Sequence, residues 1–348
     1  MNTSPNLTNR LAGWRILSFA IACSLIFGVF VLQLFNYQVI EGAEWRAQAE
    51  ENRISEFSLP TLRGVIYDRN GIVLARNIAS YNLIVLPAEL PDDQGALQEI
   101  YRQLSELVNI PINLNEISEE RPYVPCISEH GIAQIVEYGL TSTPYTNVKI
   151  ACNIDKTTAM IIKARAVDWP GIDIEVEAVR DYPTGYLTAS LIGFLGPISA
   201  DTEAYYRERG FVPNRDKIGY AGLESYYQTL LGGKPGKRVV EVDVAGQIIR
   251  DIRPPIQPIP GQNLHLTIDT RLQQAADAIL QGEINGWNAY LGEIRMTSGV
   301  VIAMNPQTGE ILAMVNYPTY ENNRFARIIP TYYYEQLLAD VRNPLLNL

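Results

Sequence analysis

Glu224 is the side chain in this sequence of 348 residues that is most suited by type and surroundings to act as a general acid, because it follows Gly219 and Gly222 in a segment marked by glycines. No second carboxylate stands at a spacing that a pair of catalytic carboxylates would use. The prediction favoured for Glu224 is therefore an ionised side chain that holds a loop through hydrogen bonds. The two histidines, His130 and His265, are far apart and have no cysteine or carboxylate at ligand spacing. The sequence thus gives little support to a metal site or a histidine-based triad, and it indicates no cofactor.

A membrane-spanning helix is expected over residues 16–35, a run of twenty residues without a charge. At about 1.5 Å per residue this run is about 30 Å long, which matches the hydrocarbon core of a bilayer. Arg10 and Arg15 precede the run, and acidic residues begin only at Glu41. Basic residues favour the cytoplasmic side, so we expect a single-pass protein whose N-terminus is cytoplasmic and whose bulk is extracytoplasmic.

A cleaved signal peptide is the alternative, since Ala47 and Ala49 offer the small residues of a cleavage site. This pair lies well beyond the apolar run, which is also longer than the roughly 7–15 residues of a signal core. A retained anchor is therefore favoured. Beyond the anchor, residues 41–57 are expected to form a helix that places Trp45 at the membrane interface.

Composition excludes some classes of partner. The chain has 28 basic and 38 acidic residues, a formal net charge of -10, and no basic cluster, so nucleic acid is not an expected partner. Outside the membrane remain about three hundred residues, enough for two modest domains or one large one. Cys126 and Cys152 would both face an oxidising compartment, where they either form a disulfide or remain two free thiols.

The segment at residues 299–320 has the pattern of a buried β-hairpin. Two uninterrupted apolar runs, residues 300–304 and 311–315, flank a turn. The turn contains Asn305, Pro306, Thr308 and Gly309. Because neither run alternates with polar residues, we expect both faces of the hairpin to be covered, as in the centre of a sheet between helices.

One covering helix is expected just before this hairpin. Residues 264–269 predict a strand that ends at a helix cap, either Asp269 or Thr270. Apolar residues then recur on one face as far as residue 280, which indicates an amphipathic helix. A second hairpin is expected at residues 63–75, where two short apolar strands meet at Asn70-Gly71, a pair that suits a tight turn.

These segments resemble, in the same order, motifs of the class B penicillin-binding proteins. The first motif opens the family's pedestal domain, and its matching residues here are Arg63, Gly64, Asp68, Arg69, Asn70 and Gly71. The second is Arg-x-Tyr-Pro-x-Gly at residues 180–185, and the third is Gly-x-x-Gly-Leu-Glu, which includes Gly222 and Glu224. The fourth leads into the family's transpeptidase domain and is matched by Asp269, Gln273, Pro306, Thr308 and Gly309.

The resemblance implies an α+β protein in three parts. Residues 1–40 would be a cytoplasmic tail and transmembrane helix, and residues 41–260 a mixed α+β pedestal domain of the dimerisation type. An inserted lobe is expected at about residues 90–170, where we find no motif but expect helices near residues 97–108 and 156–167. Residues 261–348 would be the incomplete first part of a penicillin-binding transpeptidase domain with α/β/α layers.

In the family, the enzyme is a D,D-transpeptidase that cross-links the stem peptides of peptidoglycan through an acyl-serine and is acylated by penicillins. Its nucleophile belongs to Ser-x-x-Lys, followed by Ser-x-Asn and Lys-(Ser/Thr)-Gly. No lysine here has a serine three positions before it, Lys-(Ser/Thr)-Gly is absent, and Ser-x-Asn occurs only near the N-terminus and at Ser80-Tyr81-Asn82. We therefore expect no catalytic residue in this chain and a nucleophile that belongs beyond Leu348.

Two interpretations of function remain. The favoured one is an inactive fragment of a cell-wall synthesis enzyme, more similar to the elongation type, penicillin-binding protein 2, than to the septal type. The alternative is a non-catalytic scaffold that binds and regulates a glycan polymerase of the SEDS family. In either case the resemblance implies a bacterial plasma-membrane protein whose partners are that polymerase and other elongation proteins. Peptidoglycan precursor peptides would bind only the full-length family members.

Overall fold

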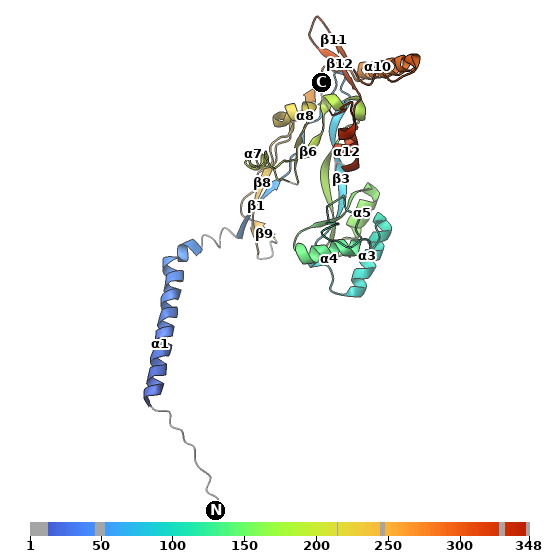
Figure 1. Cartoon of the computed structure of the whole chain (residues 1–348). Helices are drawn as coiled ribbons and strands as arrows, with labels where there is room; N and C mark the ends of the chain where they lie inside the picture. Colours follow the sequence, from blue (N-terminus) through green and yellow to red (C-terminus); the bar gives the residue numbers. More distant parts are fainter. Residues whose placement is uncertain (1–12, 46–52, 214, 244–247, 327–330, 346–348) are drawn as a thin grey trace, which may run out of the picture. The chain divides into compact units, whose positions relative to one another are not determined.

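The chain forms two compact units in a computed structural model, which describes residues 13–45, 53–213, 215–243, 248–326 and 331–345. The first unit comprises Met1–Glu56 and Val239–Ile252, and the second comprises Phe57–Arg238 and Arg253–Leu348 (Figure 1). No break between units falls at residue 261, so the division at that position stays a prediction from the sequence.

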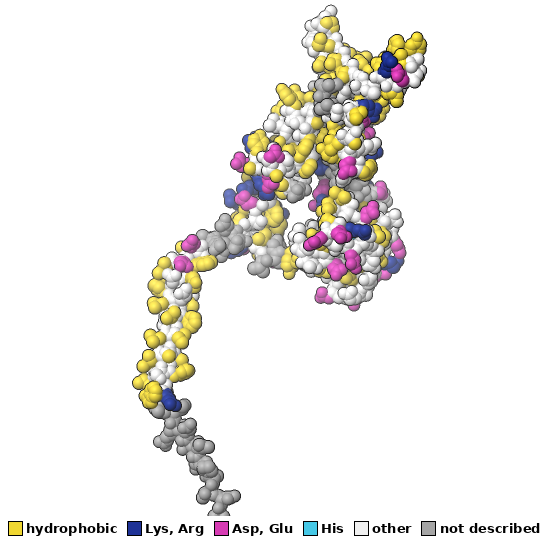
Figure 2. All heavy atoms as spheres, viewed as in Figure 1, with side chains coloured by type: hydrophobic (Ala, Val, Ile, Leu, Met, Phe, Trp, Pro, Cys, Tyr) yellow, Lys and Arg dark blue, Asp and Glu magenta, His cyan; other side chains and the backbone are white. Residues whose placement is uncertain are grey.

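The first unit contains one long apolar helix. Helix α1 (Gly13–Phe35) continues into the π-helical turn η1 (Asn36–Ile40). The 24 residues of Leu17–Ile40 are long and apolar enough to cross a membrane, and hydrophobic side chains cover the visible face of this helix (Figure 2). The predicted membrane span, residues 16–35, falls within α1. Arg10, Ala47 and Ala49 lie outside the described residues.

A three-stranded sheet follows in the order β1-β8-β9. Its strands are β1 (Ile54–Leu59), β8 (Gly236–Val242) and β9 (Ile248–Asp251). The prediction of a helix as far as Phe57 is therefore wrong at its end, because residues 54–59 belong to a strand of this sheet. Sheet pairing of this kind overrides local helical preference. The sequence over residues 238–251 alternates apolar and polar residues, which predicts a half-exposed strand that turns at Ala245-Gly246, and this turn lies outside the described residues.

The second unit is built on the long strand β3 (Val73–Val85), which pairs antiparallel with β4 (Val148–Ile154) and with β5 (Ile172–Asp181). At its start β3 pairs with β2 (Ile66–Tyr67), and β2 pairs in parallel with β10 (Leu264–His265). The predicted hairpin between β2 and β3 is confirmed. Of Asn70 and Gly71, only Gly71 has a positive φ, 82°.

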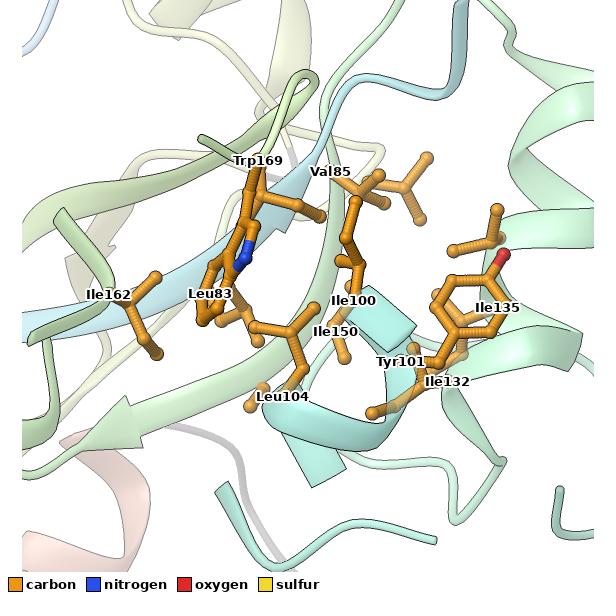
Figure 3. Packing of buried hydrophobic residues seen from close by; sticks show 14 residues of the cluster. Leu83, Val85, Ile100, Tyr101, Leu104, Ile132, Ile135, Ile150, Ile162 and Trp169 are labelled. Atoms are coloured by element: carbon orange, nitrogen blue, oxygen red, sulfur yellow. The ribbon is translucent and has the colours of Figure 1, made fainter. Parts of the chain in front are cut away.

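Helices from residues 90–170, a region called the lobe below, lie around the far end of β3, β4 and β5 (Figure 1). Its helices are α3 (Gln94–Val108), α4 (Ile132–Ser142) and α5 (Lys156–Arg165), and a 3-10 turn, η2 (Pro87–Glu89), precedes them. Their apolar faces pack with the strands into one core (Figure 3). Its buried residues include Leu83, Ile100, Tyr101, Leu104, Ile132, Ile162 and Trp169. Both predicted helices are confirmed, and Cys126 and Cys152 form a disulfide.

Short elements connect the lobe to the C-terminal part of the chain. They are η3 (Gly185–Leu187), α6 (Ala189–Ile192), β6 (Leu195–Pro197), α7 (Glu203–Arg207), β7 (Lys217–Gly219), α8 (Gly222–Tyr226) and α9 (Gln228–Leu231). Strands β6 and β7 pair antiparallel. Glycines allow the close approaches here, because a Cβ on Gly193 would lie 1.9 Å from the carbonyl oxygen of Ala221.

The C-terminal part of the chain, from Thr270 onward, begins with α10 (Thr270–Leu291) and continues with β11 (Gly299–Met304), β12 (Ile311–Tyr317), α11 (Asn323–Ala326) and α12 (Thr331–Ala339). The predicted hairpin of β11 and β12 is confirmed. Helix α10 covers one face, on which Ala313 and Val315 are buried.

The prediction that both faces of this hairpin are covered is wrong for the described residues. Val300, Ile302 and Met304 are 41%, 57% and 58% exposed. They alternate with covered residues along β11, so they point to the face opposite α10. An unbroken apolar run therefore did not mean two buried faces here.

Candidate functional site

Glu224 lies at the centre of a buried ionic cluster that joins three distant segments. Its side chain is fully buried at the start of α8. Arg180, from β5, donates from Nε to Oε1 at 2.8 Å, and Arg63 donates from Nε to Oε2 at 2.5 Å. Both arginines are themselves almost entirely buried. The first, second and third sequence motifs therefore meet at one carboxylate.

The arginines also hold the backbone around this carboxylate. Arg63 donates to the Glu224 carbonyl oxygen at 2.7 Å and to Gln228 Oε1 at 2.8 Å. Arg180 donates to the carbonyl oxygen of Gly64 at 2.8 Å. Burial raises the pKa of Tyr182 well above its ordinary value, and the charge of Glu224, 3.4 Å from its hydroxyl, adds to this effect. Tyr182 therefore remains a neutral part of the cluster.

This geometry leaves Glu224 no access to a substrate. Both carboxylate oxygens accept hydrogen bonds from guanidinium groups, and the side chain has no solvent contact. A general acid must reach the reacting group directly or through one water. The arrangement is suited to fixing three chain segments against one another.

Asp68 links the first hairpin to the start of α10. Its Oδ1 accepts hydrogen bonds from the backbone N–H groups of Asn70 and Ile72, at 2.7 and 2.8 Å. Its Oδ2 accepts from the backbone N–H and the hydroxyl of Thr270, at 3.2 and 2.8 Å. Burial raises the pKa of Asp68, but the hydrogen bonds from Ile72, Thr270 and Asn70 outweigh it, and the pKa lies below its ordinary value.

We expect Asp68→Asn to lower the free energy of unfolding by about 1–3 kcal/mol at pH 7, because an amide cannot accept from all four donors. A carboxyl with a lowered pKa stabilises the fold above its unfolded pKa of about 3.9, and this contribution disappears as the pH falls through the folded pKa. The difference between wild type and variant should therefore narrow below about pH 4. Urea unfolding between pH 3 and 7 measures it, with Asp92→Asn at an exposed position as control. A difference that stays constant over this range would contradict the account.

The start of α10 carries two further motif residues. Asp269 caps the helix by accepting from the N–H groups of Arg271 and Leu272, at 3.0 and 3.4 Å, which decides between the two predicted caps. Gln273 is fully buried, and its side-chain amide pairs with both backbone groups of Met314 in β12, at 2.7 Å each. Gln273 thus takes the place of a neighbouring strand along that edge.

The remaining motif residues do not join this cluster. Pro306, Thr308 and Gly309 form the turn at the far end of the β11–β12 hairpin, where Gly309 has a φ of 77°. Arg69 contributes through its backbone, whose N–H donates to the Ile268 carbonyl oxygen at 2.9 Å. Ser80 and Asn82, which form the Ser-x-Asn sequence at residues 80–82, are buried in β3, and the Ser80 hydroxyl donates a hydrogen bond to Asn82 Oδ1.

Sequence reasoning missed several residues that bond the C-terminal part to the rest of the second unit. Asn323 pairs through its side-chain amide with both backbone groups of Tyr182, at 2.9 and 2.8 Å. Tyr320 donates to the Ala189 carbonyl oxygen at 2.9 Å. Phe325 is buried between aromatic rings, with its centroid 4.2 Å from that of Phe194. No periodic pattern marks residues 319–326, so no signal in a single sequence pointed to them.

Metal binding has no support in this cluster. Within the described ranges, no group of three or more histidine, cysteine, aspartate or glutamate side chains is placed to hold a metal ion. These contacts join distant segments of the chain, and we define the structural junction as the Arg63–Glu224–Arg180 cluster together with the Asp68–Thr270 and Gln273–Met314 contacts.

Comparison with known proteins places this junction in a recognisable context. The family model "Penicillin-binding Protein dimerisation domain" matches residues 58–266. The "Peptidoglycan D,D-transpeptidase MrdA" of Salmonella typhimurium is 29% identical over 324 residues, which are 92% of this chain and 46% of that protein. Its counterpart in Escherichia coli K12 is 27% identical over 326 residues, with 93% and 46% covered. The chain thus spans about half the length of the curated relatives it matches.

Two solved structures share the fold. One, a complex between penicillin-binding protein PBP2 and MreC from Helicobacter pylori, aligns with a TM-score of 0.59 at 23% identity over 84% of this chain and 48% of the other. The second, described as structural coordination of polymerization and crosslinking by a peptidoglycan synthase complex, has a TM-score of 0.58 at 24% identity, covering 96% and 51%.

Proposed function

This chain belongs to the family of the penicillin-binding protein dimerisation domain, and from that premise we propose that it is the anchor, pedestal and first part of the transpeptidase domain of a class B enzyme of the elongation type. Its role would be in peptidoglycan synthesis. The observation that carries the proposal is the junction, since all four motif segments that resemble the family contribute residues to it.

The junction supports a division of labour within the longer protein. The lobe and the β3 sheet would form the pedestal, with boundaries near residues 41 and 260 as the motifs predict. Asp68, which accepts from Thr270, and Gln273, which donates to the Leu187 carbonyl oxygen, would fix the entry of the transpeptidase domain upon it. A D,D-transpeptidase that acylates a serine with a stem peptide needs its nucleophile held in a fixed position, and such a platform supplies this.

This chain would not itself carry out the D,D-transpeptidase reaction. It has no serine three positions before a lysine, the arrangement that activates the hydroxyl in this family. We propose that the anchor is Leu17–Ile40, that the N-terminus is cytoplasmic, and that all later residues are extracytoplasmic. The disulfide between Cys126 and Cys152 supports an oxidising compartment for the lobe.

Partners of the proposed pedestal are elongation proteins. MreC in one related structure and a peptidoglycan synthase complex in another support this class of partner. The finer proposal is a SEDS-family glycan polymerase in the same membrane. One observation favours the alternative of a non-catalytic scaffold: residues 319–326 already pack on the pedestal, so the junction is formed without a nucleophile.

We expect the purified chain to form no covalent adduct with fluorescent penicillin. A full-length class B enzyme serves as the positive control for labelling. A stoichiometric label that survives denaturation would refute this expectation.

We also expect the chain to copurify from detergent with the SEDS-family polymerase of the same genome. An unrelated single-pass membrane protein serves as the control for copurification. Recovery of the polymerase no better than with the control protein would refute this expectation.

A further inference from the structure

Strand β9 is unusual because its apolar side chains are exposed on both faces. Ile248 and Ile249 are 46% and 59% exposed, and Ile252 just beyond the strand is 40% exposed. Successive residues of a strand point to opposite faces, so Ile248 and Ile249 are exposed on opposite sides of β9. Soluble surfaces seldom gather apolar side chains in this way without a binding partner.

Most of the β8–β9 hairpin belongs to the same compact unit as the apolar helix α1, and β8 pairs with β1, which follows that helix in the chain. Arg53 forms an ion pair with Glu241 of β8 at 3.3 Å, and the next residue, Val242, pairs with Ile248. Only eight residue steps separate Trp45 from Arg53, which bounds their separation at about 28 Å. A segment tethered this tightly to the end of a membrane helix can reach the bilayer surface.

The charges around β9 suit the same surface. Arg250 and Arg53 both pair with Glu241, yet their side chains remain 70% and 54% exposed. Long basic side chains lay their stems along apolar surface and extend the charge to phosphate groups. Asp251, the last residue of the strand, places a charge close to these apolar side chains, so any insertion is shallow.

We propose that strand β9, with Ile248 and Ile249, rests in the interfacial layer of the bilayer as a second membrane contact beside the anchor. Lipid fits better than a protein surface, because a protein would cover one face of the strand while acyl chains and headgroups surround both. The contact would restrain the tilt of the first unit on the membrane. This inference rests on the proposed anchoring by Leu17–Ile40.

Site-directed spin labelling of the full chain in vesicles of phosphatidylethanolamine and phosphatidylglycerol tests the proposal. Cys23 is first replaced by alanine, since it is the one free thiol in the sequence once Cys126 and Cys152 are paired. A nitroxide is then placed at Ile249→Cys and, as a matched control, at Val176→Cys, an equally exposed strand position in the second unit. Accessibility to oxygen and to a water-soluble nickel complex is compared.

We expect the label at position 249 to shift toward oxygen and away from the nickel complex, while the label at position 176 remains accessible to the nickel complex. Equal nickel accessibility at both positions in these vesicles would overturn the proposal. If position 249 then became shielded only after membrane proteins were added to the vesicles, the strand would be assigned to a protein partner instead. Flotation of the chain with the vesicles separates this outcome from a failure of the anchor. A chain that does not float refutes the proposed anchoring itself, and with it this inference.

Discussion

Replacement of Glu224 by glutamine should lower the free energy of unfolding by about 3–5 kcal/mol, because it leaves Arg63 and Arg180 buried without a counter-charge. Both guanidinium groups point at the carboxylate, and neither has solvent to turn to. The midpoint of thermal unfolding of the second unit should fall by roughly 10 °C. Glutamine preserves the volume of the side chain, so the change isolates the charge.

The matched control is Glu99→Gln, which removes a carboxylate that also pairs with an arginine, Arg102, but on the exposed face of α3. Its variant should unfold at the wild-type midpoint, since exposed ion pairs are compensated by water. If Glu224→Gln behaved like this control, the buried cluster would not be what holds the three segments together.

Phe325→Ala should cost a similar amount, about 3–5 kcal/mol, because it empties a space that the surrounding rings cannot refill. Phe325 contacts the rings of Phe194, Tyr320 and Tyr333, with centroids 4.2, 5.6 and 5.9 Å away. Phe194 lies in the segment between α6 and β6, whereas the other two rings belong to the C-terminal part. The loss therefore reports how firmly the two parts of the second unit are joined.

Urea unfolding followed by tyrosine fluorescence measures this loss, and Tyr332→Ala provides the control. Tyr332 is in the same C-terminal stretch but is 66% exposed, so removing its ring leaves no cavity. Equal midpoints for the Phe325 and Tyr332 variants would mean that residues 319–326 do not stabilise the unit.

Elements with a strong local pattern were predictable from the sequence. The long apolar helix, the two hairpins, both lobe helices and a helix cap at either Asp269 or Thr270 each follow from neighbouring residues alone. Membership of the family followed from four short motifs in order. The helix predicted as far as Phe57 failed because residues 54–59 pair with β8, which is more than 175 residues away along the chain.

The junction was beyond the reach of such patterns. Arg63, Arg180 and Glu224 were recognised as motif residues, but their meeting at one carboxylate depends on tertiary contacts across 161 and 44 positions. Asn323 and Gln273 hold backbone groups through side-chain amides, a role that leaves no periodicity in the sequence. The exposed face of β11 was missed because an apolar run reports hydrophobic character and not what covers it.

The central claim is that the junction fixes the C-terminal part on the pedestal as one stable unit, and native-state hydrogen exchange tests it most directly. The backbone N–H of Gly64 bonds to Leu231 within the pedestal and serves as the reference. The N–H groups of Tyr182 and Thr270 bond to Asn323 and Asp68, and each of these two bonds joins the pedestal to the C-terminal part. The account predicts slow exchange at all three amides in the same range. Rapid exchange at Tyr182 and Thr270 beside a protected Gly64 would contradict it.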